Sequence, residues 1–241
     1  MRSLAAAIAF MTRLPVGRVV QFDGTDVSRG AAWFPLVGVL LGLIYALAAW
    51  VLQPHLPLPV LAVMLVILDA AATGALHYDG LADTADGFGG GKTRDDVLRI
   101  MRDHAVGSYG AVAMASLVAL KATAYAALLN GSQWATALIL TPLLGRWSIL
   151  LLTAAMPYAR TSSSVIEGMG NRSLFWGTLI LLGALGAARQ GRCWIASAVV
   201  LAVTAVFGLY CKRRIGGITG DTLGASVQLS EAAALIAFIA V

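Results

Sequence analysis

The chain has 241 residues, of which 59% are hydrophobic and only 12% are charged. Soluble globular proteins contain about 25% charged residues, so this chain lacks the polar side chains that a water-exposed surface of its size requires. The composition therefore excludes an ordinary soluble domain, a disordered protein and a disulfide-rich secreted module. A membrane protein also explains the net charge of +5, because lysine and arginine collect in cytoplasmic loops. We predict an integral membrane protein with no nucleic-acid partner.

The first residues form a short apolar segment that stops at a proline. It runs from 4 to 14 and ends in the sequence Arg13-Leu14-Pro15. A helix needs about 20 apolar residues to cross a bilayer, so this segment is too short to span. We therefore predict an interfacial or re-entrant helix within residues 1–20.

Longer apolar stretches follow through the rest of the chain, and no linker divides them into domains. Each stretch is close to the length of a helical span. We predict an all-α, polytopic transmembrane helical bundle that forms a single domain over residues 1–241, with about seven spans and a range of six to eight. The expected spans are 31–52, 57–78, 107–129, 134–156, 173–188, 193–210 and 221–241.

Basic residues fall mainly on one side of these spans. Of the 17 lysines and arginines, 13 lie on the side that holds the N-terminus, and only Arg189 and Arg192 lie on the other. Because basic loops resist translocation, we expect the N-terminus to be cytoplasmic. Lys121 and Arg146 lie inside expected spans and are candidate partners for the two acids there, Asp69 and Glu231.

Acidic residues are concentrated at the end of the second expected span. Seven of the 12 acids lie between positions 69 and 103. If the helix continues, Asp79, Asp83 and Asp86 lie at i, i+4 and i+7 on one face. Like charges at this spacing destabilise a helix, and Mg²⁺ prefers carboxylate and phosphate oxygens. We interpret the cluster as a metal site rather than a solvated acidic helix end.

The acidic, glycine-rich residues 79–106 are expected to form a cytoplasmic active-site loop. The Gly-Lys pair at Gly91 and Lys92 is not a P-loop, because the first glycine of that motif is replaced by Asp86. Its backbone N–H groups are still suited to phosphate, and Arg102 is suited to bidentate phosphate binding. A second polar motif, 216–225, opens the last span on the same side and offers Asp221 as a fourth metal ligand.

Taken together, these motifs resemble those of the bacterial adenosylcobinamide-GDP ribazoletransferases, also called cobalamin (5′-phosphate) synthases. They occur in the family's order and cover nearly the whole chain, although the polar stretch 161–167 is longer than the resemblance leads us to expect. The matching segments are 12–15, 77–87, 101–103 with Gly107 and Gly110, 145–147, 157–160 and 216–225.

The resemblance implies a Mg²⁺-dependent transferase in the bacterial inner membrane, with its active site facing the cytoplasm. Its partners would be the lipid bilayer, adenosylcobinamide-GDP and α-ribazole or its 5′-phosphate, and GMP would be released. The resemblance is also compatible with a homo-oligomer. The implied roles are catalytic for Asp83, Asp86, Arg102 and Asp103, metal-binding for Asp79, Asp83, Asp86 and Asp221, and substrate-binding for Arg13, His77, Lys92, Arg146, Arg160, Gly220 and Thr222.

Two alternatives differ in the expected pattern of essential residues. A CDP-alcohol phosphatidyltransferase also uses aspartates and Mg²⁺ in the membrane, but here Asp83 and Asp86 follow Asp79-Gly80 too closely for that motif. An ion-coupled transporter would depend on charges at mid-membrane, whereas the transferase would depend on the cytoplasmic motifs.

Overall fold

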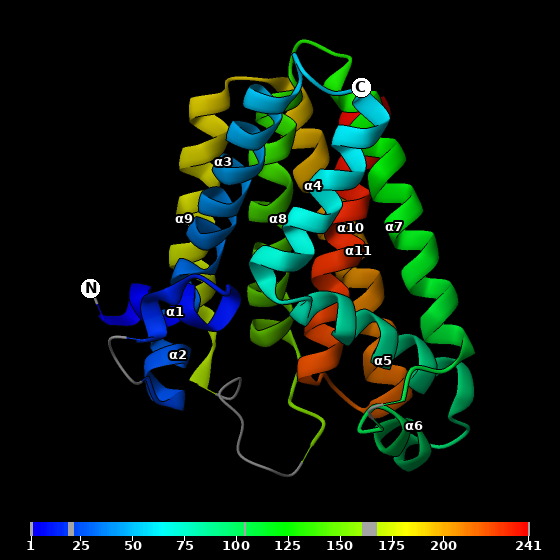
Figure 1. Cartoon of the computed structure of the whole chain (residues 1–241). Coiled ribbons are helices and arrows are strands. Elements are labelled where there is room, and N and C mark those ends of the chain that lie inside the picture. Colours follow the sequence, from blue (N-terminus) through cyan, green and yellow to red (C-terminus); the bar gives the residue numbers. More distant parts are fainter. Residues whose placement is uncertain (1, 19–21, 104, 161–167, 241) are drawn as a thin grey trace.

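The computed structural model describes residues 2–18, 22–103, 105–160 and 168–240. Within these ranges the chain is helical, and its one β-type contact is an isolated bridge between Tyr158 and Ile218. The predicted all-α bundle is confirmed. Its long helices run side by side (Figure 1), and they are α3 Phe34–Leu52, α4 Leu58–Thr73, α7 Ser108–Leu129, α8 Trp134–Ala155, α9 Asn171–Ala188, α10 Gly191–Ile215 and α11 Gly220–Ala240.

The helices α8 and α11 lie at the centre of the bundle and are more buried than the other spans. The helix α3 packs along α8, and α11 packs against α5, α8 and α10. Apolar side chains from α1, α3, α4 and α7–α11 join in one core. The two central helices therefore connect the core to the polar end at which α11 begins.

Five segments are long and apolar enough to cross a membrane: Gly24–Leu52, α7, α8, α10 and α11. A sixth exists if α4 and α5 (Leu76–Gly90) count as one broken span. The helix α9 stands beside these spans in Figure 1, but it begins with Asn171 and Arg172 and falls short of their apolar content. Length and composition thus support five or six spans. Six is the lower end of the predicted range, five lies below it, and both are fewer than the seven we expected.

The second expected span does not continue as one helix through the aspartates. It ends at Thr73, and α4 and α5 meet at an angle of 93°. Gly74 and Ala75 both have left-handed backbones, with φ of 64° and 57°, and such a residue ends a helix. The short helix α5, which carries three aspartates, therefore runs across the end of the bundle (Figure 1), and we treat it as lying outside the membrane-spanning part.

The N-terminal segments lie at the same end of the bundle as α5 (Figure 1). They are α1 Arg2–Met11, η1 Pro15–Arg18, α2 Gly24–Gly30 and η2 Ala31–Trp33. The predicted N-terminal helix is thus α1, which ends before Pro15. The expected loop 79–106 is largely helical, because α5 and α6 (Arg94–Ile100) occupy most of it.

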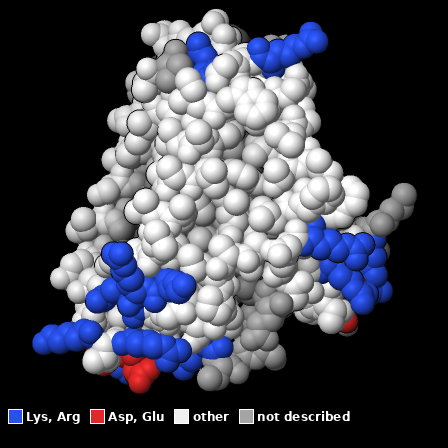
Figure 2. Space-filling model, turned by 180° about the vertical axis from the view of Figure 1, so that it is seen from behind, with Lys and Arg blue, Asp and Glu red and all other residues white. Residues whose placement is uncertain are grey.

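Basic side chains gather toward this lower end of the molecule, and a few lie at the upper end, with a broad uncharged belt between them (Figure 2). The upper end holds the junction of α9 and α10, where Arg189 and Arg192 lie. The arrangement is that of a bundle whose middle faces lipid and whose lower end faces water.

Candidate active site

The helix α5 presents its aspartates at the lower end of the bundle. Asp79 is exposed, Asp83 is half-buried and Asp86 is buried. Residues four apart on a helix share a face, so Asp79 and Asp83 lie one turn apart on the same side of α5. The predicted helical spacing is therefore present, although the helix that carries it is a separate one.

Asp221, in the first turn of α11, joins these aspartates because α5 and α11 touch through glycines. A Cβ atom at Gly80 would lie only 2.7 Å from the carbonyl oxygen of Asp221 and 3.0 Å from Cα of Gly224. A larger residue at Gly80 would push the two backbones apart. The pKa of Asp83 is raised to about 6, first by burial and then by the charges of Asp79, Asp221 and Asp86. The carboxylates therefore form one electrostatic cluster.

Arg160 supplies a positive charge to this cluster. Its Nη2 donates a hydrogen bond of 2.6 Å to Oδ2 of Asp221. The segment that carries Arg160 is held beside α11 by two backbone bonds, from Ala159 N–H to the carbonyl of Ile218 and from Ile218 N–H to the carbonyl of Pro157. The Nε of Arg160 is buried without a hydrogen-bond partner in the described residues. One arginine donor thus stays unused next to the carboxylates.

A pocket of about 170 Å³ opens beside Asp79 and Asp221. Both acids line it together with His77, whose ring nitrogens are buried and have no hydrogen-bond partner among the described residues. Apolar side chains form the rest of the wall, including Phe10 and Met169. The pocket therefore combines a carboxylate edge with an apolar wall, as small-molecule sites commonly do.

Asp86, unlike Asp79 and Asp83, binds backbone groups of another helix. Its carboxylate accepts hydrogen bonds from the backbone N–H of Gly107, at 2.7 Å, and of Gly110, at 2.9 Å. A Cβ atom at either glycine would lie within 2.5 Å of a carboxylate oxygen of Asp86. Both oxygens thus serve the free N–H groups at the start of α7. The position of α5 against α7 depends on this contact.

The other predicted residues of this end lie on segments that adjoin α5. Arg13 lies at the break between α4 and α5, where its backbone N–H donates to the carbonyl of Ala72. Arg102 and Asp103 are exposed between α6 and α7, and Lys92 is exposed between α5 and α6. The stretch 161–167 lies outside the described residues.

Two predicted residues lie at the start of α11 in different surroundings. Thr222 is fully buried, and its hydroxyl accepts from the N–H of Thr219 and donates to the carbonyl of Thr219. This local hydrogen bonding caps the helix, which accounts for the threonine without a substrate. Gly220 is exposed, and a Cβ atom there would meet nothing within 4 Å.

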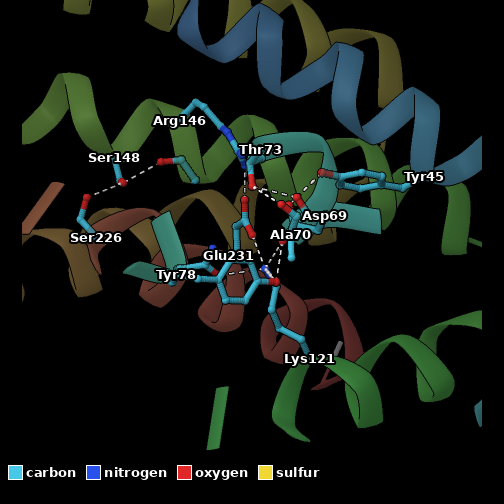
Figure 3. Close-up of polar contacts among 12 residues, drawn as sticks. Tyr45, Asp69, Ala70, Thr73, Tyr78, Lys121, Arg146, Ser148, Ser226 and Glu231 are labelled. Carbon is cyan, nitrogen blue, oxygen red and sulfur yellow. Dashed lines mark hydrogen bonds and ion pairs between the residues drawn. The ribbon is translucent and has the colours of Figure 1, made fainter. Parts of the chain in front are cut away.

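A second cluster of charges lies inside the bundle (Figure 3). Lys121 Nζ donates to Asp69 at 2.8 Å, to Glu231 at 2.5 Å and to Gln228 at 2.9 Å. Arg146 pairs with Glu231. Asp69 also accepts bonds of 2.8 Å from two tyrosine hydroxyls, those of Tyr45 and Tyr78.

The buried cluster confirms that Lys121 and Arg146 neutralise the two acids inside the spans. It joins α3, α4, α5, α7, α8 and α11. Arg146, which we predicted to bind substrate, is fully buried within it, and its observed partner is Glu231. Charges inside a membrane protein are retained where they are paired, so this cluster fixes the packing of the helices that carry the aspartates.

Two further arginines, which the sequence pattern does not distinguish from other basic residues, hold the site together. Arg214 donates from Nη2 to the carbonyls of Phe88 and Gly91, both at 2.8 Å, at the end of α5. Arg94 donates to the carbonyls of Ile215 and Ala159 at 3.0 and 2.6 Å. Their sequence pattern is that of ordinary basic anchors, so only the fold distinguishes them.

The four predicted metal ligands do not form a closed cage. Across the described residues, no group of three or more His, Cys, Asp or Glu side chains is placed to hold a metal ion. Asp86 is occupied by backbone N–H groups, and one oxygen of Asp221 is bound by Arg160. Asp79, Asp83 and the second oxygen of Asp221 are left as donors. Mg²⁺ is commonly held by only one or two carboxylates with substrate phosphates, and these donors fit that mode.

Comparisons with known proteins agree with these motifs. A family model described as cobalamin-5-phosphate synthase matches residues 3–239. A protein of Ralstonia nicotianae named adenosylcobinamide-GDP ribazoletransferase is 40% identical over 240 residues, which are 95% of this chain and 92% of that protein. Proteins of the same name from Syntrophobacter fumaroxidans and Shewanella frigidimarina are 38% and 37% identical, over 93% and 98% of this chain and 93% of each relative.

No solved structure is significantly similar to this one. The family match covers almost the whole chain, and it includes every motif on which the sequence resemblance was based. The chain therefore belongs to the cobalamin-5-phosphate synthase family.

Proposed function

We propose that this protein transfers the adenosylcobinamide-phosphate group of adenosylcobinamide-GDP to the 3′-hydroxyl of α-ribazole or α-ribazole 5′-phosphate. The products are adenosylcobalamin, or its 5′-phosphate, and GMP. The observation that carries the proposal is the cluster of Asp79, Asp83 and Asp221 with Arg160 beside a pocket. The names of the relatives supply the substrates.

In this reaction the 3′-oxygen of the ribazole forms a bond to the phosphorus that bears the cobinamide, and the bond from that phosphorus to GMP breaks. The hydroxyl proton needs an acceptor. Asp83 is suited to this role, because its pKa of about 6 is nearer neutrality than that of an ordinary carboxyl. Asp86 is not suited, because both its oxygens accept backbone hydrogen bonds. We assign the proton to Asp83.

Asp79 and Asp221 would hold Mg²⁺, since both line the pocket and Oδ1 of Asp221 is left free by Arg160. When bound, the ion would neutralise negative charge on the pyrophosphate and on the departing GMP. Arg160, whose Nη2 binds Asp221, would add a positive charge that attracts the substrate phosphates. Arg13, beside the break between α4 and α5, and Arg102, between α6 and α7, would bind the outer phosphate oxygens.

The proposed location is the bacterial inner membrane, with the active site facing the cytoplasm. The support is the gathering of basic residues at the end that carries the aspartates (Figure 2). A cysteine introduced at the exposed position Asp95 should react with a membrane-impermeant maleimide only after intact cells are opened. Labelling of intact cells would contradict this orientation.

The test of the function is direct. Purified protein in detergent is incubated with adenosylcobinamide-GDP, α-ribazole and Mg²⁺, and GMP and the corrinoid product are measured. Asp79→Asn and Asp83→Asn should lower kcat by about 10² to 10⁴-fold, whereas Asp95→Asn, at an exposed acid of α6, should not. No product from folded protein, or full activity in Asp83→Asn, would reject the proposal. Phosphatidyl transfer from a CDP-lipid would support the alternative enzyme.

A further inference from the structure

A second and larger cavity, of about 1000 Å³, opens on the side of the bundle between α2, η2 and the first half of α9. We call it the α9 cleft and define it by six of its lining residues: Arg29, Trp33, Arg172, Trp176, Leu179 and Ile180. It is separate from the aspartate pocket, which lies between α1, α3, α5, α8 and α11. None of the motif residues assigned to the transfer reaction lines it.

The α9 cleft is charged at one end and apolar at the other. Arg172 lies in the first turn of α9, whereas Leu179 is seven residues further along, or about 10 Å into the bundle. Trp176 lies between them and is half exposed. Trp33 lines the same cleft from η2, and its indole N–H donates to the hydroxyl of Ser3. Tryptophans at such a boundary are typical of the membrane interface.

The two arginines of the cleft are free to bind an anion. Arg29 and Arg172 are both exposed, and neither forms a hydrogen bond or an ion pair with any residue that the structure describes. Two other arginines at this end are paired, Arg2 with Asp26 and Arg160 with Asp221. Arginine binds phosphate oxygens bidentately. The charge at the cleft therefore matches a phosphate.

We propose that the α9 cleft binds an anionic phospholipid of the surrounding bilayer. The lipid phosphate would be held by Arg29 and Arg172, the glycerol backbone would lie at the level of Trp33 and Trp176, and an acyl chain would follow Leu179 and Ile180. The apolar end favours a lipid over a free phosphate or a nucleotide, because neither of those ligands has an acyl chain to pack against the apolar wall near Leu179.

The cleft and the aspartate pocket share one wall. Gly168 and Gly170 line the α9 cleft, whereas Met169 between them is buried and lines the aspartate pocket. A lipid held against the glycines would thus fix the position of Met169 at the pocket. We expect bound lipid to raise turnover, and this second step rests on the proposed transferase function, whereas lipid binding does not.

Lipid binding is tested by native mass spectrometry of the full chain, purified from nanodiscs that contain phosphatidylcholine with phosphatidylglycerol. The wild type should retain phosphatidylglycerol in preference to phosphatidylcholine. The double variant Arg29→Gln/Arg172→Gln should bind it at least about tenfold more weakly, because charge-assisted bonds are lost. The control Lys212→Gln/Arg213→Gln removes the same charge at exposed positions of α10 outside the cleft and should bind like the wild type.

A variant that fills the α9 cleft tests lipid binding without changing either arginine. Gly170 has an extended backbone, and a Cβ atom there would meet nothing within 4 Å, so Gly170→Leu should fold normally and fill part of the cleft. It should also lose the lipid. Equal retention in all variants, or no preference for phosphatidylglycerol, would overturn the proposal. Retention of GMP in place of lipid, lost in Arg29→Gln/Arg172→Gln, would identify a nucleotide site and also overturn it.

Activity in nanodiscs with and without phosphatidylglycerol tests the second step. Turnover should rise with the anionic lipid in the wild type and in Lys212→Gln/Arg213→Gln, but not in Gly170→Leu. Lipid retention without any change in turnover would reject only the link through Met169. Absence of turnover in every membrane would reject the transferase function and leave the lipid site standing on its binding data.

Discussion

The carboxylate of Asp86 accepts a hydrogen bond of 2.7 Å from the backbone N–H of Gly107, at the start of α7. This contact assigns Asp86 to the junction of two helices, although its spacing from Asp79 and Asp83 is that of a third metal ligand. A residue can therefore belong to an acidic motif and still act through the helix that it positions.

We expect Asp86→Ala to act mainly on stability. It removes the acceptor for the N–H groups of Gly107 and Gly110, and loss of a capping carboxylate costs about 1 to 2 kcal/mol. The melting temperature in detergent should fall, while Mn²⁺ binding, followed by electron paramagnetic resonance as a substitute for Mg²⁺, should persist. A loss of Mn²⁺ affinity without any loss of stability would show that Asp86 is a metal ligand.

We expect protonation of Asp83 to stabilise the fold, in the presence of EDTA, as the pH falls from about 7 to 5. His77 acts in the opposite direction over this range, because burial lowers its pKa. The folded state raises the pKa of Asp83 from 3.8 to about 6, so between these values the folded protein binds more protons than the unfolded one. Lowering the pH therefore increases the stabilising contribution of Asp83 until both states are protonated, below about 4.

The check is the difference in melting temperature between the two pH values for the wild type and Asp83→Asn. Relative to the wild type, the variant should be less stable at pH 5 than at pH 7, because its amide cannot take up the stabilising proton. Asp95→Asn, at an exposed position, serves as the control and should keep the pH dependence of the wild type. An equal pH dependence in the wild type and Asp83→Asn would show that Asp83 does not contribute.

We expect Lys121→Met to be strongly destabilising. It leaves Asp69 without a positive partner inside the bundle and leaves Glu231 with Arg146 alone, and breaking a buried ion pair from one side costs about 3 to 5 kcal/mol. The double variant Asp69→Asn/Lys121→Met removes one charge of each sign and should recover part of this loss.

A denaturation series in sodium dodecyl sulfate on the two single variants and the double variant checks this coupling. If the effects of the two substitutions simply add, Asp69 and Lys121 do not stabilise one another. The transporter alternative predicts ion flux that is lost when Lys121 is replaced, even where stability is unchanged. Such flux would contradict the enzyme interpretation.

We expect Arg214→Gln to impair the enzyme where Arg213→Gln does not. Arg214 binds the two carbonyls at the end of α5, whereas its neighbour Arg213 is exposed. Loss of two charge-assisted bonds should lower the melting temperature and, by loosening α5, lower kcat more than it changes KM. Identical behaviour of the two variants would show that Arg214 is only a basic anchor.

Much of the architecture could be predicted from the sequence, because bilayer insertion is set by composition and length. The apolar stretches predicted the helices α3, α7, α8, α9, α10 and α11 to within a few residues, apart from the C-terminal end of α10. The stretch 57–78 was predicted as one helix but is divided between two. It contains Gly74 and Ala75, and an apolar run does not reveal where a backbone turns left-handed.

The candidate site was predicted in part, because spacing identifies residues on one helix but not their partners on another. The pairing of Asp69 and Glu231 with Lys121 and Arg146 was predicted as a group, since unpaired charges inside a membrane are costly. The roles of Asp86, Thr222 and Arg214 could not be predicted, because each depends on a backbone group that tertiary packing brings close.

The sequence by itself determined that this protein lies in a membrane, how its charges are distributed between the two ends, and which aspartates lie together on one helix. These properties follow from composition, apolar length and helical periodicity, which are local. Only the tertiary structure decided which aspartates keep free oxygens, because that depends on contacts between α5, α7 and α11. The scarce charge of the chain is thus divided between a buried cluster that fixes the helices and an open cluster that they present.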